Sequence, residues 1–213
     1  MNVERGDHPD DHDWILSSRP ADDLAPHFRF LLQECVYRGD PNDSSKFNDP
    51  AYNHRVVLPE FPREQALRPS STEIIGHEEE LVAYYARVGA VAPPYAGSPN
   101  YRLQLSLESS ATAAQIGFPW WDRVRDAVEF IRWLREGASG TGFVDIDQGW
   151  LIHAFRVDDR FYFLECDPDD GDRTRLGFSV DREAFIDRLA KVESSTRMVI
   201  DFLKQRIGAD HWS

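Results

Sequence analysis

The chain has 213 residues, of which 41% are hydrophobic and 12% aromatic, so it is long enough to bury a core of its own. Its 24 Lys and Arg residues stand against 37 Asp and Glu residues, which gives a formal charge of −13. Such a surface repels phosphate, which argues against binding to nucleic acid or to an anionic membrane. A basic protein partner would instead be attracted.

Cysteine usage and the apolar pattern indicate where the protein works. Two cysteines without CxxC spacing do not make a disulfide framework, so we expect a reducing cytoplasm. The sequence contains no long apolar run, so neither a signal peptide nor a membrane span is expected. No complete cofactor motif is present, and we expect no cofactor.

Residues 1–13 are polar and acidic, which predicts a flexible arm in front of a single α+β domain at 14–213. His8 and His12 lie four residues apart in this arm beside several aspartates. They are a weak candidate for a divalent metal site, because Pro9 disfavours a helix that would align them.

The first half of the chain predicts two helices, a long loop and one strand. Leu24, Phe28, Leu31 and Cys35 recur at steps of three and four residues, which predicts a helix at about 24–38. The five prolines of residues 40–72 predict a long connecting loop that wraps the sheet. The periodic apolar pattern then predicts a helix at about 76–88, and clean alternation predicts a strand at about 102–108.

A third helix is predicted at about 119–136, with a broad apolar stripe facing the core. Trp133 does not lie on this stripe and projects from the polar face between Asp126 and Glu129. A tryptophan in that position is either covered by another part of the chain or serves as an anchor for a partner.

The stretch from 142 to 180 predicts the sheet. Short apolar and aromatic runs are broken at 147–149, 158–159 and 167–173, which is typical of strands joined by tight turns. With the earlier strand, these runs predict an antiparallel meander of four to five strands, at about 102–108, 142–147, 150–157, 160–167 and 174–179.

A two-residue turn at Asp158 and Asp159 would place Val157 opposite Arg160 and would make both faces of this hairpin mostly apolar. Each face must then be covered. We expect two C-terminal helices, at about 181–192 and 195–207, to cover one face. The 119–136 helix would lie against the other.

One catalytic constellation follows from the predicted register. If 147–149 is a three-residue loop, Asp145 faces Leu151, Leu151 faces Cys166, and His153 lies diagonal to Asp145 and Cys166. A thiol, an imidazole and a carboxylate are the parts of a nucleophile, its base and an orienting group. The apolar neighbours would raise the pKa of the thiol, so a core histidine beside an inert cysteine is the simpler interpretation.

These observations favour a protein-binding module that occludes a partner, most concretely an immunity-type inhibitor of a bacterial toxin. The residues predicted to contact the partner are Trp133 and the acidic Asp126, Glu129, Asp169, Asp170 and Asp172. The alternative is a small hydrolase or transferase that uses Cys166, His153 and Asp145. A homodimer whose interface covers one face of the sheet is a third hypothesis.

Overall fold

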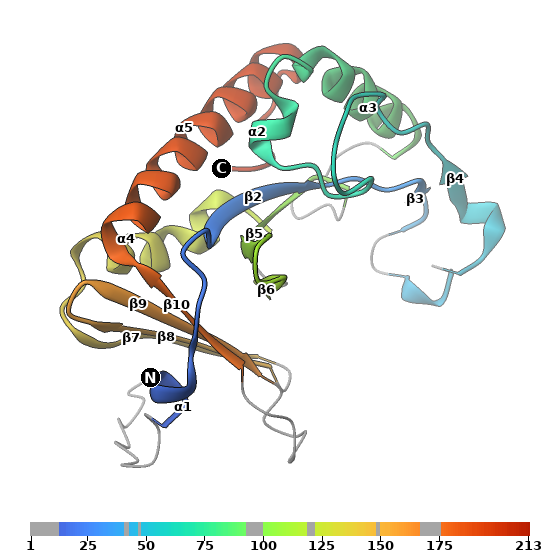
Figure 1. The fold of residues 1–213 in the computed structure, drawn as a ribbon. Helices are drawn as coiled ribbons and strands as arrows, with labels where there is room; N and C mark the ends of the chain where they lie inside the picture. The colour runs from blue at the N-terminus through green and yellow to red at the C-terminus, as the bar shows by residue number, and fades with distance from the viewer. Residues whose placement is uncertain are drawn as a thin grey trace. The chain divides into compact units, whose positions relative to one another are not determined.

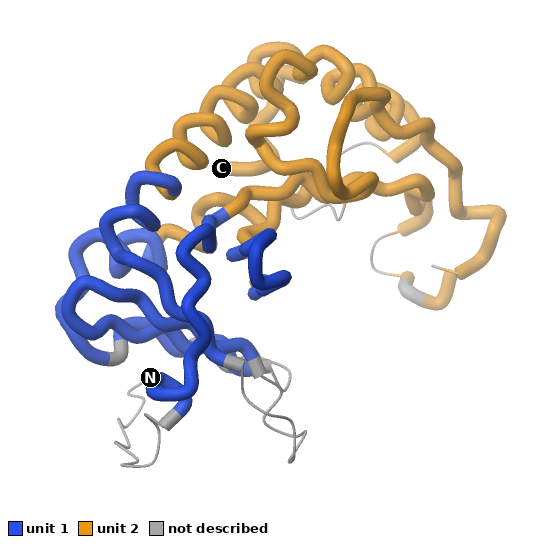
Figure 2. Tube along the Cα trace, viewed as in Figure 1, with its two compact units in different colours: residues 1–26, 107–117, 129–188 blue, residues 27–106, 118–128, 189–213 orange. Residues whose placement is uncertain are grey.

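The computed structural model describes residues 13–40, 43–46, 48–92, 100–118, 122–147, 150–166 and 176–213 (Figure 1). The fold is α+β, with antiparallel sheets flanked by helices, as predicted. The sequence suggested one domain, and the contacts divide the chain into two compact units (Figure 2). Unit 1 consists of Met1–Pro26, Leu107–Gly117 and Glu129–Arg188, and unit 2 of His27–Ser106, Phe118–Val128 and Leu189–Ser213.

The largest sheet belongs to unit 1 and has the strand order β1-β10-β9-β8-β7 (Figure 1). Its strands are β1 (Arg19–Pro20), β7 (Gly140–Asp147), β8 (Trp150–Val157), β9 (Arg160–Cys166) and β10 (Leu176–Asp181). The pairs β7-β8, β8-β9 and β9-β10 are antiparallel, whereas β1 pairs with β10 in parallel. The predicted pairing of Val157 with Arg160 is confirmed. Asp158 makes the turn with a φ of 50°, a conformation that aspartate tolerates better than most residues.

The predicted strand at 102–108 is confirmed as β5 (Arg102–Ser109), but its place in the meander was wrong. It lies in a separate sheet with the order β2-β5-β6, in which β2 is Ala25–Leu31 and β6 is Ala114–Gly117. The alternating pattern of a strand reports which side is buried and carries no information about which sheet the strand joins.

Both faces of the unit 1 sheet carry buried apolar side chains, as predicted, although Val144 and Val157 remain exposed on one of them. Phe161 and Phe163 lie on one face, where they pack against rings of α4 (Val128–Glu136) and of the start of α5 (Arg182–Ile207), with centroids 5.4 to 6.3 Å apart. The helix at 119–136 was therefore assigned to the wrong face. It is also shorter than predicted, since a 3-10 turn, η3 (Val124–Ala127), precedes α4.

The other face is covered by a short N-terminal helix, α1 (Asp13–Ser17), that periodicity did not reveal. Its Trp14 is 4% exposed, packs against Phe155 and Leu164, and lies 5.5 Å from the ring of His153. Gly177 in β10 makes room for the indole, because a Cβ there would lie 2.8 Å from Trp14 Cε3. The arm predicted at 1–13 lies outside the described residues except for Asp13, which begins α1.

The helix predicted at 76–88 is confirmed as α3 (Glu78–Val91), which follows a short α2 (Ser71–Ile74) in unit 2. The helix predicted at 24–38 was wrong, because these residues form β2 and β3 (Cys35–Tyr37), and β3 pairs with β4 (Asn53–Arg55). In β2 the buried positions include Pro26, Phe28 and Phe30, an alternation of period two that the steps of three and four residues had masked.

The two predicted C-terminal helices form the single continuous helix α5. Ser194 or Ser195 was expected to begin a new helix, since hydroxyl residues often cap helices. Instead, Ser195 Oγ donates to the carbonyl of Lys191 at 3.1 Å, and Thr196 Oγ1 donates to that of Val192 at 2.7 Å. Hydroxyls that bond back to the preceding turn are tolerated inside a helix.

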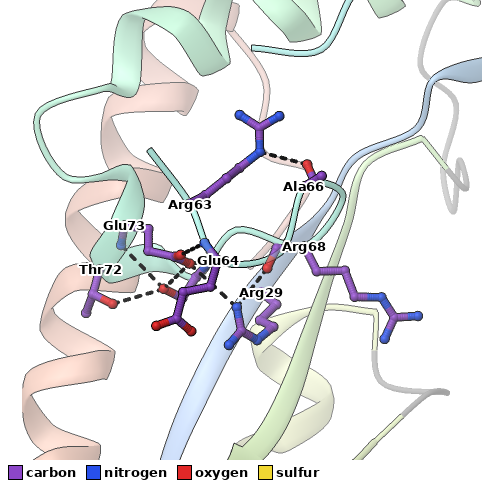
Figure 3. Close-up of polar contacts among 8 residues, drawn as sticks. Arg29, Arg63, Glu64, Ala66, Arg68, Thr72 and Glu73 are labelled. Carbon is purple, nitrogen blue, oxygen red and sulfur yellow. Dashed lines mark hydrogen bonds and ion pairs between the residues drawn. The ribbon is translucent and has the colours of Figure 1, made fainter. Parts of the chain in front are cut away.

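The segment predicted as a loop at 40–72 is held by charged side chains of unit 2 (Figure 3). It also contains two short 3-10 helices, η1 (Ser44–Lys46) and η2 (Pro50–Tyr52). Arg29, which is 3% exposed, donates to the carbonyl of Arg68 at 2.8 Å and lies 3.5 Å from Glu73 Oε2. Glu73 accepts hydrogen bonds from the backbone N–H of Glu64 and Ser70. Burial raises the pKa of Glu73, but these hydrogen bonds and Arg29 outweigh it, and the net pKa is lowered.

The C-terminal residues pack into unit 2. Trp212 is fully buried against the rings of Tyr85, Tyr101 and Phe30, and its carbonyl accepts the N–H of Val124 at 2.9 Å. Across the part of the chain that the structure describes, no helix is long and apolar enough to cross a membrane.

Candidate functional site

The predicted Cys-His-Asp constellation does not form in the register of the sheet. Asp147 pairs with Trp150, so the connection between β7 and β8 has two residues instead of three. Asp145 therefore stands opposite Ile152, and Val144 stands opposite His153. Leu151 does pair with Cys166, as predicted. Strand positions alternate between the two faces of a sheet. The one-residue shift therefore places Asp145 at a position on the opposite face from His153.

His153 itself lies in apolar surroundings. It is 5% exposed, stands opposite Leu164 in the ladder and packs against Trp14. The side chains of Asp145 and Cys166 lie outside the described residues. The positions that the structure does describe agree with a core histidine.

Trp133, the predicted anchor, is a packing residue of unit 1. Its indole is half-buried, with its ring 5.6 Å from that of Phe161 and 6.1 Å from that of Phe130. It also lies directly against Gly137 and Gly142. Gly142 is the extra residue of a bulge in β7, between Thr141 and Phe143. Of the two roles considered for Trp133, cover by the protein's own chain is the one that these contacts show.

The other predicted contact residues make local interactions or lie outside the described residues. Asp126 Oδ2 accepts the N–H of Asp122 and of Arg123, each at 3.0 Å, and so holds the start of η3. Glu129 is exposed and pairs with Arg132 at 2.8 Å. The residues outside the described part of the chain are Asp169, Asp170, Asp172, His8 and His12. Among the residues that are described, no group of three His, Cys, Asp or Glu side chains could hold a metal ion.

The geometry reveals a different candidate, which we call the acidic end of unit 1 and define as Glu136, Asp158, Asp159 and Glu183. These residues come from the end of α4, the turn between β8 and β9, and the start of α5. All four are exposed. The three elements that carry them are joined by hydrogen bonds within unit 1.

Arginines make these hydrogen bonds by donating to backbone carbonyls. Arg156 Nη1 donates to the carbonyl of Gly137 at 2.5 Å, just beyond α4, and its Nε donates to that of Asp158 at 3.1 Å. Arg182 Nη2 donates to the carbonyl of Arg135 at 2.9 Å, and the Arg182 N–H donates to that of Asp159 at 2.8 Å. Both guanidinium groups therefore hold the backbone of the acidic end together.

The carboxylates of the acidic end make no salt bridge within the part of the chain that the structure describes. Within the described residues, none of the four side chains makes a hydrogen bond or an ion pair. Arg156 and Arg182 donate to carbonyl oxygens rather than to these carboxylates, although both keep their positive charge at this end of the unit. A group of carboxylates without direct ion pairs, carried on a backbone held by hydrogen bonds, is a preorganised surface for cationic groups.

The net charge of the protein is concentrated in the same unit. Unit 1 contains 10 Lys and Arg against 22 Asp and Glu, a net charge of −12, whereas unit 2 contains 14 against 15, a net charge of −1. A comparison of the two halves of the sequence does not show this division, because residues 1–100 contain 9 Lys and Arg against 17 Asp and Glu, and residues 101–213 contain 15 against 20. The units are built from interleaved segments, so only the fold shows how the charge is divided.

Two further carboxylates of unit 1 have structural roles. Asp23 accepts hydrogen bonds from the hydroxyl groups of Ser109 and Ser110 and from the N–H of Ala111, and the pKa of Asp23 is lowered to about 2 as a result. Glu165 is partly buried and accepts the N–H of Gly117 at 3.1 Å. Burial raises the pKa of Glu165.

Comparisons with models of known protein families, with curated proteins and with solved structures find no match to this chain.

Proposed function

We propose that this chain is a protein-binding module that occludes a basic partner through unit 1, and most concretely that it is an immunity-type inhibitor of a bacterial toxin. The observation that carries the proposal is the concentration of negative charge in unit 1, together with an acidic end whose four carboxylates make no ion pair with any residue that the structure describes.

Charge of this kind acts on association before contact is made. A patch of one sign attracts a patch of the opposite sign during diffusion and raises the association rate, and it disfavours acidic competitors. Inhibition by occlusion needs fast, selective binding and no chemistry. The acidic end supplies the first requirement without any catalytic group.

The backbone supporting the acidic end favours the same role. Arg156 and Arg182 fix the turn at Asp158 and Asp159 to the ends of two helices. A surface that is already ordered loses less conformational entropy when a partner binds, so more of the interaction energy appears as affinity. We place this activity in the cytoplasm, where the exposed free thiol of Cys35 would stay reduced.

The proposal is tested by co-expressing the chain with the product of each neighbouring gene in a host that those products harm. We expect the chain to restore growth against one basic product. The combined substitutions Asp158→Asn, Asp159→Asn and Glu183→Gln should weaken this rescue. If no neighbouring product is harmful, or if a harmful one is not neutralised, the toxin-inhibitor form of the proposal is wrong.

A further inference from the structure

Unit 2 contains a small cavity of about 110 Å³ between β2, η3 and the part of α5 that belongs to this unit. Its size is comparable to the ~150 Å³ cavities that hold a benzene-sized molecule in other proteins. One wall is apolar and is formed by Phe28, Val124 and Ile200. Phe28 and Ile200 are buried, so this wall is part of the core.

The other wall carries charge. Glu193, Arg197 and Asp201 line the cavity and follow one another at intervals of four residues on α5, which places them along one face of the helix. Glu193 already interacts within the chain. By contrast, Arg197 and Asp201 make no hydrogen bond or ion pair with any residue that the structure describes.

Arg197 and Asp201 lie four residues apart on α5, in the order that favours a pair between them less. Along a helix, an acidic residue four positions before a basic one pairs better than the reverse order. Arg197 precedes Asp201, which is the less favourable order. A guanidinium and a carboxylate therefore stand at the mouth of a hollow with an apolar wall. Neither makes a salt bridge within the described residues, although the charge of Asp201 acts on Lys204.

The cavity is also preformed. Thr196, one of its lining residues, is buried and has its hydroxyl bonded to the carbonyl of Val192 and to Ser71 Oγ at 2.9 Å. The N–H of Val124 is held by the carbonyl of Trp212. A site whose walls are fixed in this way requires little rearrangement to accept a ligand.

We propose that this cavity binds a free apolar α-amino acid. The ligand carboxylate pairs with Arg197, its ammonium group pairs with Asp201, and its side chain lies against Phe28, Val124 and Ile200. A simple carboxylic acid would leave Asp201 unused and a simple amine would leave Arg197 unused. Of these three classes of ligand, a zwitterion with an apolar side chain is the one that complements Arg197, Asp201 and the apolar wall. The lining is completed by Glu193, Thr196 and Ser213. This site is independent of the acidic end in unit 1.

The test is a titration of the ¹⁵N-labelled full chain with L-leucine, followed by amide chemical shifts. We expect saturable shifts centred on Phe28, Val124 and Ile200, with a dissociation constant of roughly 1 mM, as is usual for so small a ligand. Arg197→Gln should weaken binding about tenfold, since it removes a charge-assisted pair. Lys191→Gln is the matched control, because Lys191 is exposed on α5 and does not line the cavity.

Three analogues complete the experiment: 4-methylpentanoate lacks the ammonium group, 3-methylbutylamine lacks the carboxylate, and glycine lacks the side chain. All three should bind more weakly than leucine. The proposal is overturned if leucine gives no saturable shifts, if the shifts lie away from the cavity, if Arg197→Gln binds like the wild type, or if any analogue binds as well as leucine.

Discussion

The indole of Trp133 lies against the α-carbon of Gly142, in the volume that any side chain at that position would occupy. The helix that carries Trp133 and the strand that carries Gly142 therefore meet at a point where only glycine fits. This packing explains Gly142, whereas Gly140 at the start of β7 has open space around it and a φ of 114°, which favours glycine.

Gly142→Ala is expected to destabilise unit 1 by roughly 1–3 kcal/mol, because the added methyl group forces the indole to move within a packed face. Gly117→Ala is the matched control, since a Cβ at this strand glycine would meet nothing within 4 Å. Urea unfolding of both variants measures the difference. Equal losses of stability in the two variants would show that the close approach to Trp133 has no energetic role.

Trp133→Ala is expected to lower the free energy of unfolding by about 2–4 kcal/mol, since it removes a large ring packed against Phe161 and two glycines. At temperatures where the Trp133→Ala variant is folded, its affinity for a basic partner should be close to that of the wild type. A loss of affinity with an unchanged melting temperature would instead make Trp133 an anchor.

Trp14→Ala is expected to lower the free energy of unfolding by about 3 kcal/mol, because Trp14 packs against Phe155 and Leu164 on one face of the sheet. Leu16→Ala, in the same short helix, should change stability by less than about 0.5 kcal/mol, since Leu16 is 88% exposed. Chemical denaturation measures both values. If the two substitutions had the same effect, α1 would not be held through Trp14.

Asp23 predicts a specific dependence of stability on pH. The pKa of Asp23 is lowered from 3.8 to about 2, mainly by the hydrogen bond from Ser109. The ionised carboxylate therefore stabilises the folded state fully above about pH 4, and this stabilisation is lost as the pH falls towards 2. Asp23→Asn should therefore be less stable than the wild type at pH 7, and the difference should shrink between about pH 4 and 2.

Asp158→Asn is the control for this experiment, because asparagine also tolerates the left-handed conformation of this turn. Its stability at pH 7 should match that of the wild type. Denaturation midpoints recorded from pH 7 to 2 test the pair. A constant difference between Asp23→Asn and the wild type across this range would contradict the assigned role of Asp23.

The sequence was a good guide wherever a local pattern has only one structural solution. Short, nearly continuous apolar runs on both sides of Asp158 and Asp159 specify a hairpin, and β8 and β9 appear where expected. The pattern from Leu24 to Cys35 has two solutions. Leu24, Phe28 and Leu31 have helical spacing, whereas Pro26, Phe28 and Phe30 are two residues apart, as in a strand. The burial of Phe28 and Phe30 in a strand is decided by their tertiary neighbours.

The candidate site was harder to predict, because it depends on long-range contacts. A one-residue difference in the turn after Asp147 was enough to separate Asp145 from His153. The acidic end depends on Arg156 and Arg182 binding carbonyls rather than carboxylates, and no sequence pattern reports that choice. Only the acidic pair at 158–159 was visible in advance, as a turn.

The binding proposal is tested most directly by the affinity of three matched proteins for the basic partner captured from the native cell. The first is the wild type, and the second carries Asp158→Asn, Asp159→Asn and Glu183→Gln. The third, a control with the same change in net charge, carries Glu34→Gln, Glu60→Gln and Glu64→Gln, which replace exposed carboxylates of unit 2.

Isothermal titration calorimetry at two salt concentrations gives the three dissociation constants. We predict that the unit 1 variant binds about tenfold more weakly than the wild type, that the unit 2 variant binds equally well, and that added salt reduces the difference. Equal affinities for the wild type and the unit 1 variant, or an equal loss in both variants, would contradict binding through the acidic end.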